Sequence, residues 1–83
     1  MTLSILTPMN RFYEGEIKSI TLQTLDGIVQ ILPRYAPYVT GLADGIATIV
    51  SANGEQRQAK IDGGFAEVVD NKVAILTDEA EWV

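Results

Sequence analysis

The chain contains neither cysteine nor histidine. Without cysteine there is no disulfide framework, no thiolate metal site and no cysteine nucleophile, and the chain fits a reducing compartment. Without histidine the commonest general base and metal ligand is missing, so the serines lack a partner that could activate them. No apolar run approaches the roughly 18 residues that cross a bilayer, and the N-terminus lacks the features of a signal peptide. We therefore expect no catalytic residue, no metal site, no cofactor and no direct membrane insertion.

Positive charge is also scarce. The 83 residues carry a net charge of −5, and the six lysines and arginines are scattered along the sequence. A protein that binds nucleic acid needs a clustered basic face, because it must release counterions from the phosphates. We therefore expect no nucleic-acid partner, and the acidic surface is typical of a small soluble domain.

Two short motifs resemble catalytic or phosphate-binding features and are better explained otherwise. Glu14 and Glu16 flank a glycine, and such a pair is more often a solvated strand entry than a catalytic dyad. Asp62-Gly63-Gly64 precedes a strand-like run, whereas a phosphate-binding loop precedes a helix. Neither motif indicates an enzyme.

Turn signals are the most regular feature of the chain. They are Asp26-Gly27, Asp44-Gly45, Asn53-Gly54, Asp62-Gly63 and Asp70-Asn71. Such dipeptides supply the positive φ of tight hairpins, and short strands between turns every 8–12 residues are typical of a sandwich or barrel. The sequence therefore predicts one all-β domain over residues 1–83, a small flattened β-sandwich of two sheets of short, mostly antiparallel strands. The expected strands are Leu3–Leu6, Ile17–Thr24, Ile28–Leu32, Ile46–Val50, Gln58–Ile61, Phe65–Val69 and Val73–Thr77.

The burial patterns of these runs predict further details. The offset between Ile17 and Ile20 breaks strict alternation, as a β-bulge would. The runs Ile46–Val50 and Val73–Leu76 are apolar on both faces, so we expect them to be central or covered by a partner. Asn53-Gly54 and the Asp70-Asn71 turn should each close a hairpin.

The segment Leu32–Thr40 contains two prolines four residues apart. Pro33 and Pro37 fix φ and bias the residues before them toward extended conformations, which excludes a helix. The segment is too apolar for an ordinary solvated loop. We interpret it as a rigid, shaped contact surface between strands.

The C-terminal residues 78–83 differ from the rest. Asp78 and Glu81 have the spacing of a capping box, which predicts the start of a helix that is truncated or absent here. Trp82 is the only tryptophan, and we expect it to pack locally.

Five segments, in order, span nearly the whole chain and together form a recognisable pattern. They are Phe12–Glu16, Leu32–Thr40, Gly45–Ile46, Gly63–Val68 and Val73–Glu81. This pattern resembles the N-terminal β-sandwich domain of the epsilon subunit of F-type rotary ATP synthases. The resemblance implies a non-catalytic central-stalk rotor subunit of a proton- or sodium-translocating complex, which couples c-ring rotation to the gamma subunit and the catalytic head. It also implies a peripheral location at the cytoplasmic face of the inner (plasma) membrane, through the complex.

The resemblance also implies contact residues. Carried over position by position, the residues facing the gamma subunit would be Thr7, Tyr35, Ala36, Pro37 and Thr40. Those reaching the polar loops of the c-ring would be Asp26, Gly27 and Ile28.

The chain departs from the family pattern at three positions and in its length. The family usually has Gly-His-Ala-Pro where this chain has Arg34-Tyr35-Ala36-Pro37, and often an acidic residue where Ile28 stands and glycine where Gln30 stands. The C-terminal helical hairpin of the family is not part of this sequence, so we expect the chain neither to bind ATP nor to inhibit by hairpin extension. A naturally short subunit is mildly favoured over an excised domain.

Two alternatives remain open from the residues alone. One is a free-standing β-sandwich module that binds another protein through Pro33–Thr40. The other is a small ligand-binding or hydrolytic sandwich, which would require a convergent polar pocket.

Overall fold

The computed structural model describes residues 1–83, which form nine β-strands and no helix. The all-β prediction is confirmed. No helix exists that is long and apolar enough to span a bilayer. The strands are β1 (Thr2–Leu6), β2 (Arg11–Thr24), β3 (Gly27–Ile31), β4 (Tyr38–Leu42), β5 (Gly45–Ser51), β6 (Gln56–Ile61), β7 (Gly64–Val69), β8 (Lys72–Leu76) and β9 (Ala80–Trp82).

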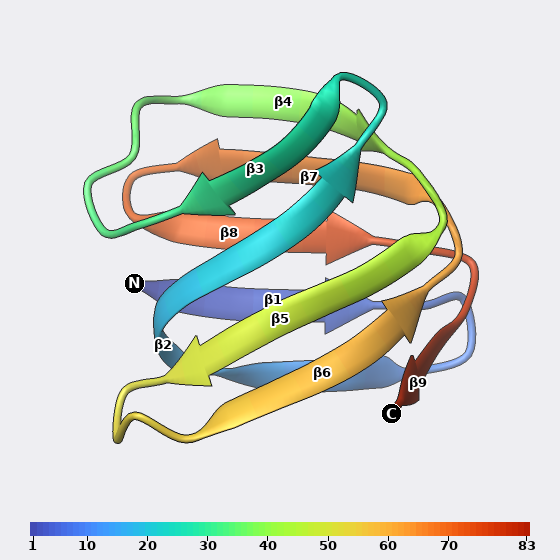
Figure 1. Ribbon diagram of the computed structural model, residues 1–83, viewed down its shortest axis with the longest axis horizontal. Coiled ribbons are helices and arrows are strands. Elements are labelled where there is room, and N and C mark those ends of the chain that lie inside the picture. Colours follow the sequence, from blue (N-terminus) through green and yellow to red (C-terminus); the bar gives the residue numbers. More distant parts are fainter.

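The strands lie in two layers that face each other (Figure 1). The rear sheet contains β4, β7, β8, β1 and the first half of β2, and the front sheet contains β3, the second half of β2, β5, β6 and β9. The 14-residue strand β2 therefore belongs to both layers, pairing with β1 through Arg11–Glu16 and with β5 after Ile17. Only β1 and β8 are parallel, so the expectation of a mostly antiparallel sandwich is confirmed.

The core between the layers consists of aliphatic side chains that alternate along each strand. Leu3 and Ile5 of the rear sheet are fully buried, as are Ile20 and Ile31 of the front sheet. Half-buried aromatic side chains pack against this core, with Tyr35, Tyr38, Phe12, Tyr13 and Trp82 among them.

The turns act as the sequence predicted at three places. Asn53-Gly54 lies between the paired strands β5 and β6, and Asp70-Asn71 lies between β7 and β8 with φ of 50° and 62°. Asp26-Gly27 connects β2 with β3. Asp44-Gly45 and Asp62-Gly63 close no hairpin, because they carry the chain from one layer to the other.

Two finer expectations are confirmed. The register of β2 against β5 shifts between Ile17 and Ser19, where the bulge was predicted. Strand β5 lies between β2 and β6, and β8 lies between β1 and β7, so both doubly apolar runs are central.

Two expectations about secondary structure were wrong. Tyr38–Leu42 is strand β4 and not part of a loop, because its β-favouring residues pair with β7 directly after Pro37. Residues 80–82 form strand β9 on β6 and not the start of a helix. There the Trp82 ring packs on Phe12 with centroids 4.6 Å apart, and the Arg57 guanidinium lies 3.5 Å from its centroid. These tertiary contacts override the local capping-box signal. Trp82 packs within the chain, as expected, but on residues that are distant in the sequence.

Candidate interaction surface

The outer face of the rear sheet carries large apolar side chains. Val39 of β4 is 66% exposed, Phe65 of β7 is 62% exposed and Leu76 of β8 is 54% exposed. Their neighbours along the strands, such as Ala66 and Ile75, are buried, so the outward direction of the three side chains follows from strand alternation.

Most of these side chains are neighbours across the strands, and the exposed carboxylate of Glu67, which pairs with Val39, lies among them. Phe65 pairs with Gly41 on one side and Leu76 on the other, and Leu76 pairs in turn with Leu6 of β1. Leu25 lies directly over Gly41, where an added Cβ would be 2.7 Å from Leu25 Cδ1. Contiguous apolar patches on small proteins are typical of interaction sites. We call this surface, made by Leu6, Leu25, Val39, Phe65 and Leu76, the outer face.

The segment between β3 and β4, residues 32–37, forms a rigid loop at one end of this sheet. The Tyr35 N–H donates to the Leu32 carbonyl over 3.1 Å, and Arg34 has a φ of 67°. A proline followed by a residue with positive φ inside such a hydrogen bond is the pattern of a type II turn. We call residues 32–37 the Pro loop.

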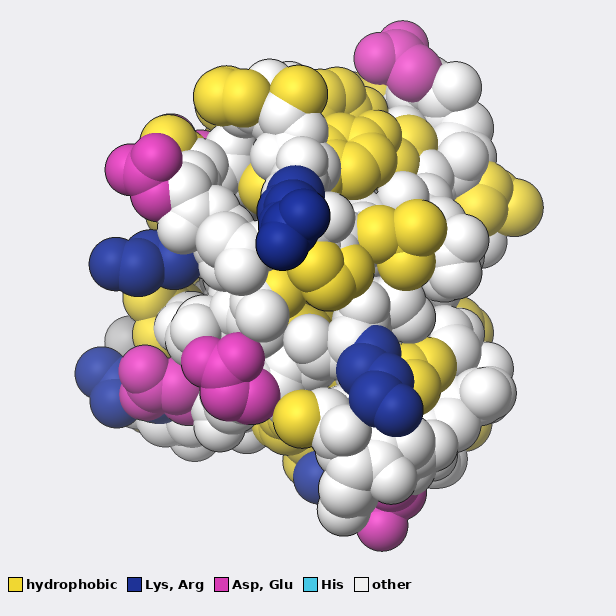
Figure 2. All heavy atoms as spheres, turned by 90° about the vertical axis from the view of Figure 1, so that its left-hand side faces the viewer, with side chains coloured by type: hydrophobic (Ala, Val, Ile, Leu, Met, Phe, Trp, Pro, Cys, Tyr) yellow, Lys and Arg dark blue, Asp and Glu magenta, His cyan; other side chains and the backbone are white.

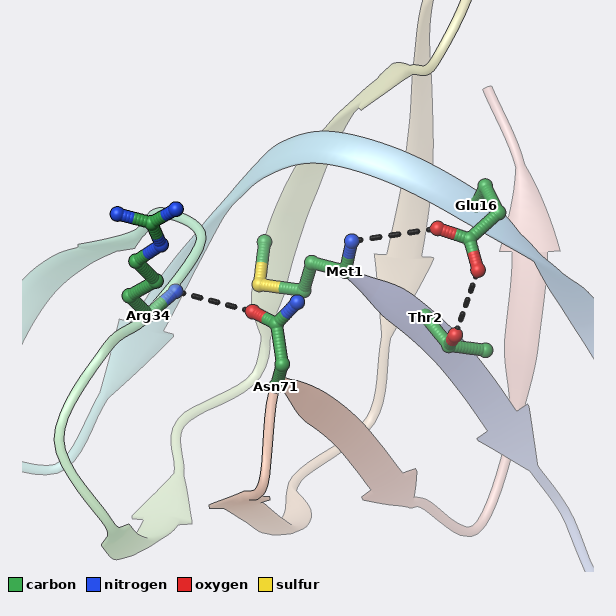
Figure 3. A network of polar contacts seen from close by, with 5 residues as sticks. All are labelled: Met1, Thr2, Glu16, Arg34 and Asn71. Atoms are coloured by element: carbon green, nitrogen blue, oxygen red, sulfur yellow. Dashed lines mark hydrogen bonds and ion pairs between the residues drawn. The ribbon is translucent and has the colours of Figure 1, made fainter.

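The Pro loop is also fixed to the neighbouring hairpin. The Arg34 N–H donates to Asn71 Oδ1 over 2.9 Å (Figure 3), and the Tyr35 ring packs edge to face on Tyr38 at 5.8 Å. The side chains of Ala36 and Pro37 remain exposed. The loop therefore presents an apolar surface of fixed shape.

The structure places the residues predicted to face gamma at two ends of the rear sheet. Tyr35, Ala36 and Pro37 lie together in the Pro loop, beside Asn71 at the start of β8. Thr7 lies at the opposite end, because it follows β1, which runs parallel to β8. Five residues of strand separate these ends by about 16 Å. Thr7 and the Pro loop therefore belong to one surface only if the outer face connects them.

Thr40 is the exception in this set. It is only 7% exposed, and its hydroxyl donates to the Gly41 carbonyl over 3.1 Å. The outward side chain at this point of β4 is that of its neighbour Val39.

Sequence reasoning did not name Phe65 or Leu76 as contact residues, and it included Val39 only as part of the contact segment Leu32–Thr40. A signal for Leu76 was present in the sequence, because the run Val73–Leu76 is apolar on both faces. Such a run is either central in its sheet or covered by a partner.

The three residues predicted to reach the c-ring lie together in the β2–β3 turn. Asp26, Gly27 and Ile28 are all exposed, and Ile28 is 68% exposed. The Thr24 hydroxyl holds the turn, since it accepts from the Asp26 N–H at 3.1 Å and donates to the Gly27 carbonyl at 2.7 Å. The turn lies at the end of the molecule opposite the Pro loop (Figure 1).

The carboxyl group of Glu16 has a shifted pKa. A hydrogen bond from the Thr2 hydroxyl, 2.8 Å from Oε1, and an ion pair with the terminal amino group of Met1, 3.2 Å from Oε2, lower the pKa of Glu16 (Figure 3). This exposed carboxylate joins the start of β1 to β2, so its contacts are structural.

Comparison with known proteins gives the family. All of residues 1–83 match the family described as ATP synthase, Delta/Epsilon chain, beta-sandwich domain. The chain belongs to this family. The resemblance to the epsilon subunit that the sequence segments suggested is thereby confirmed.

Curated relatives of this family member carry the name ATP synthase epsilon chain. The protein from Caldanaerobacter subterraneus subsp. tengcongensis is 38% identical over 80 residues, which cover 96% of this chain and 58% of the relative. The protein from Chlorobaculum tepidum is 37% identical over 78 residues, which cover 94% of this chain and 89% of the relative. The chain thus spans between 58% and 62% of the first relatives that it matches.

Solved structures agree on the fold. A chain in the cryo-EM structure of the Euglena gracilis mitochondrial ATP synthase, described as OSCP/F1/c-ring in rotational state 1, has a TM-score of 0.90 and 32% identity. That match covers 96% of this chain and 51% of the other. A chain of the Tetrahymena thermophila central stalk and c-ring has a TM-score of 0.81 at 19% identity, with 96% and 64% of the two chains covered, and supports the fold alone.

Proposed function

We propose that this β-sandwich is a non-catalytic rotor component of the central stalk of an F-type ATP synthase. It binds the gamma subunit through the outer face and the Pro loop, and it contacts the polar loops of the c-ring through the Asp26–Ile28 turn. In this role it is attached to the cytoplasmic face of the inner (plasma) membrane only through the complex. The observation that carries the proposal is the predominantly apolar outer face on a member of the Delta/Epsilon family.

The arrangement of the predicted gamma contacts supports this assignment. Thr7 and the Pro loop lie at opposite ends of the rear sheet, and the exposed side chains of Val39, Phe65 and Leu76 lie between them. A partner that covers the outer face therefore reaches both ends. Thr40 contributes by holding β4 in place and not by direct contact.

Rigidity suits a component that transmits rotation. The Pro loop has two proline-restricted φ angles and is tied to Asn71, so it loses little conformational entropy when a partner docks. The outer face is built on paired strands, whose registers are fixed by the buried alternate residues. The Pro loop and the outer face therefore keep their shape when force is transmitted through them.

Titration calorimetry with the purified gamma subunit tests the gamma contact. Phe65→Asp places a charge at the centre of the outer face, and we expect it to weaken binding at least about thirtyfold, as for the centre of an interface. Ile28→Asp is the matched control, because Ile28 is equally apolar and similarly exposed but lies on β3 of the front sheet. Equal loss in both variants, or no loss in Phe65→Asp, would contradict the proposed surface.

Photo-crosslinking in the assembled complex tests both contacts together. The chain has no cysteine, so Ile28→Cys and Val39→Cys each create a unique site for a benzophenone label. We expect the label at position 28 to reach the c-ring and the label at position 39 to reach gamma. A well-folded chain that binds neither subunit would favour the free-standing interaction module instead.

A further inference from the structure

Arg34 occupies a backbone conformation that disfavours its own side chain. Its φ is 67°, at the third position of a turn where glycine is the preferred residue. The other non-glycine residues with positive φ are Asp70 and Asn71, which tolerate this region well within a tight hairpin. An arginine there costs the fold about 1–2 kcal/mol relative to an unstrained position. Such strain commonly marks a functional position.

The guanidinium group of Arg34 has no partner within the chain. The ion pairs of the structure join the Met1 amino group to Glu16 and Arg11 to Glu14, and the only cation–π contact is that of Arg57 with Trp82. Figure 3 shows the Arg34 side chain extending away from Asn71, while Glu16 lies on the far side of Met1. The charge is therefore free to meet a group on another molecule.

The surroundings of Arg34 make a charge contact effective. Its neighbours Leu32, Pro33, Ala36 and Pro37 are exposed and apolar. On this side of the molecule hydrophobic side chains form a band with separate basic side chains in it, and acidic and further basic side chains lie toward the left and lower margins (Figure 2). When a partner covers apolar surface and removes water, the attraction between a cation and a carboxylate increases.

The backbone of Arg34 is also held in place from two sides. Its N–H is bound by Asn71, and the Leu32–Tyr35 hydrogen bond closes the turn around it. A left-handed residue in a fixed turn has a fixed Cα–Cβ direction, so the arginine side chain leaves the loop from a defined position.

We propose that Arg34 binds a carboxylate of the gamma subunit and thereby sets which gamma surfaces this chain accepts. The inference rests on the proposed function and deepens it, because it names the chemistry at the Pro-loop end of the outer face. A planar guanidinium binds a carboxylate through two parallel hydrogen bonds, so Arg34 would contribute orientation and association rate as well as affinity.

Four variants separate this contact from a structural role. Arg34→Gly removes the charge and relieves the strained φ, whereas Arg34→Lys keeps the charge without the planar donors. Arg34→Glu reverses the charge. Lys18→Glu is the matched control, because it changes the net charge equally at an exposed position on β2 that lies outside the Pro loop.

We expect calorimetry against gamma to show about tenfold weaker binding for Arg34→Gly, a partial loss for Arg34→Lys, and a larger loss for Arg34→Glu. Lys18→Glu should bind like the wild type. Raising the salt concentration from roughly 0.05 M to 0.5 M should weaken the wild type more than Arg34→Gly. The urea midpoint of Arg34→Gly should rise, because the strained φ is relieved. If the arginine had only a structural role, a variant that is more stable would not also bind gamma more weakly.

The outcomes distinguish the two proposals. If Arg34→Gly binds as tightly as the wild type with the same salt dependence while Phe65→Asp still weakens binding, the Arg34 contact is overturned and the proposed function stands. If the folded wild type does not bind gamma at all, the proposed function fails and the Arg34 contact fails with it.

Discussion

Replacing Gly64 with alanine is expected to destabilise the fold by about 3–5 kcal/mol. Gly64 begins β7 with a φ of 105°, and a Cβ added there would lie 1.9 Å from the Leu76 carbonyl oxygen and 2.9 Å from Thr77 Cα. Two costs therefore combine. The positive φ costs an alanine about 1–2 kcal/mol, and the clash is with backbone, so β7 and β8 must move apart at a cost of about 2–3 kcal/mol.

The size of this loss is large for so small a domain. A chain of 83 residues has a total stability of about 4–12 kcal/mol at typical values per residue. Gly64→Ala thus removes a substantial share, and a destabilised variant should also lose the register that sets Phe65 beside Leu76.

Gly27→Ala provides the matched control for this prediction. Gly27 has a φ of 116°, close to that of Gly64, but nothing lies within 4 Å of an added Cβ. We expect Gly27→Ala to lower the free energy of unfolding by only about 1–2 kcal/mol, which is the cost of the positive φ. Urea unfolding followed by circular dichroism measures both values. Equal losses in the two variants would refute the argument that close approach of β7 to the end of β8 requires glycine at position 64.

Three further predictions concern contacts outside the outer face. Trp82→Ala should lower the free energy of unfolding by about 2 kcal/mol, because Trp82 joins β9 to Phe12, and urea unfolding measures the loss. Asn71→Ala should speed hydrogen exchange at the Arg34 amide, because that amide loses its acceptor. NMR measures the exchange rate, and an unchanged rate would contradict this expectation. Because the pKa of Glu16 is lowered in the folded state, its ionised carboxylate stabilises the fold above the ordinary pKa of glutamate. This stabilisation is lost as the pH falls through the pKa of the folded state. Urea unfolding should therefore show Glu16→Gln to be less stable than the wild type near about pH 7 and equally stable near about pH 2.

Local signals in the sequence were sufficient for most strands and for the turns that connect neighbours. Asp70-Asn71 required positive φ at both positions, and the structure has it. The offset between Ile17 and Ile20 indicated a bulge without any knowledge of the partner strand. These features depend on backbone conformation and alternation, which a single sequence carries.

The elements that the sequence did not predict depend on distant partners. Strand β9 exists because Trp82 finds Phe12 and Arg57, more than 20 residues away in the chain, and the local Asp78 spacing pointed to a helix. The same limit applied to the site. Thr40 and Val39 are adjacent, and only the pairing of β4 with β7 decides which of them points outward.

The two proposed contacts are joined by a short and stiff connection. The Asp26–Ile28 turn continues directly from β2, and the end of β2 is bound to β4 by two hydrogen bonds, Leu25 N–H to the Gly41 carbonyl at 3.1 Å and Ala43 N–H to the Gln23 carbonyl at 2.9 Å. Gly41 in turn pairs with Phe65 in the outer face. A force applied at the turn by the proposed ring contact would therefore pass to the proposed gamma-binding surface through paired backbone and not through a flexible linker. Because extended, hydrogen-bonded strands change length very little, this connection suits a part that must rotate with both of its neighbours without slip.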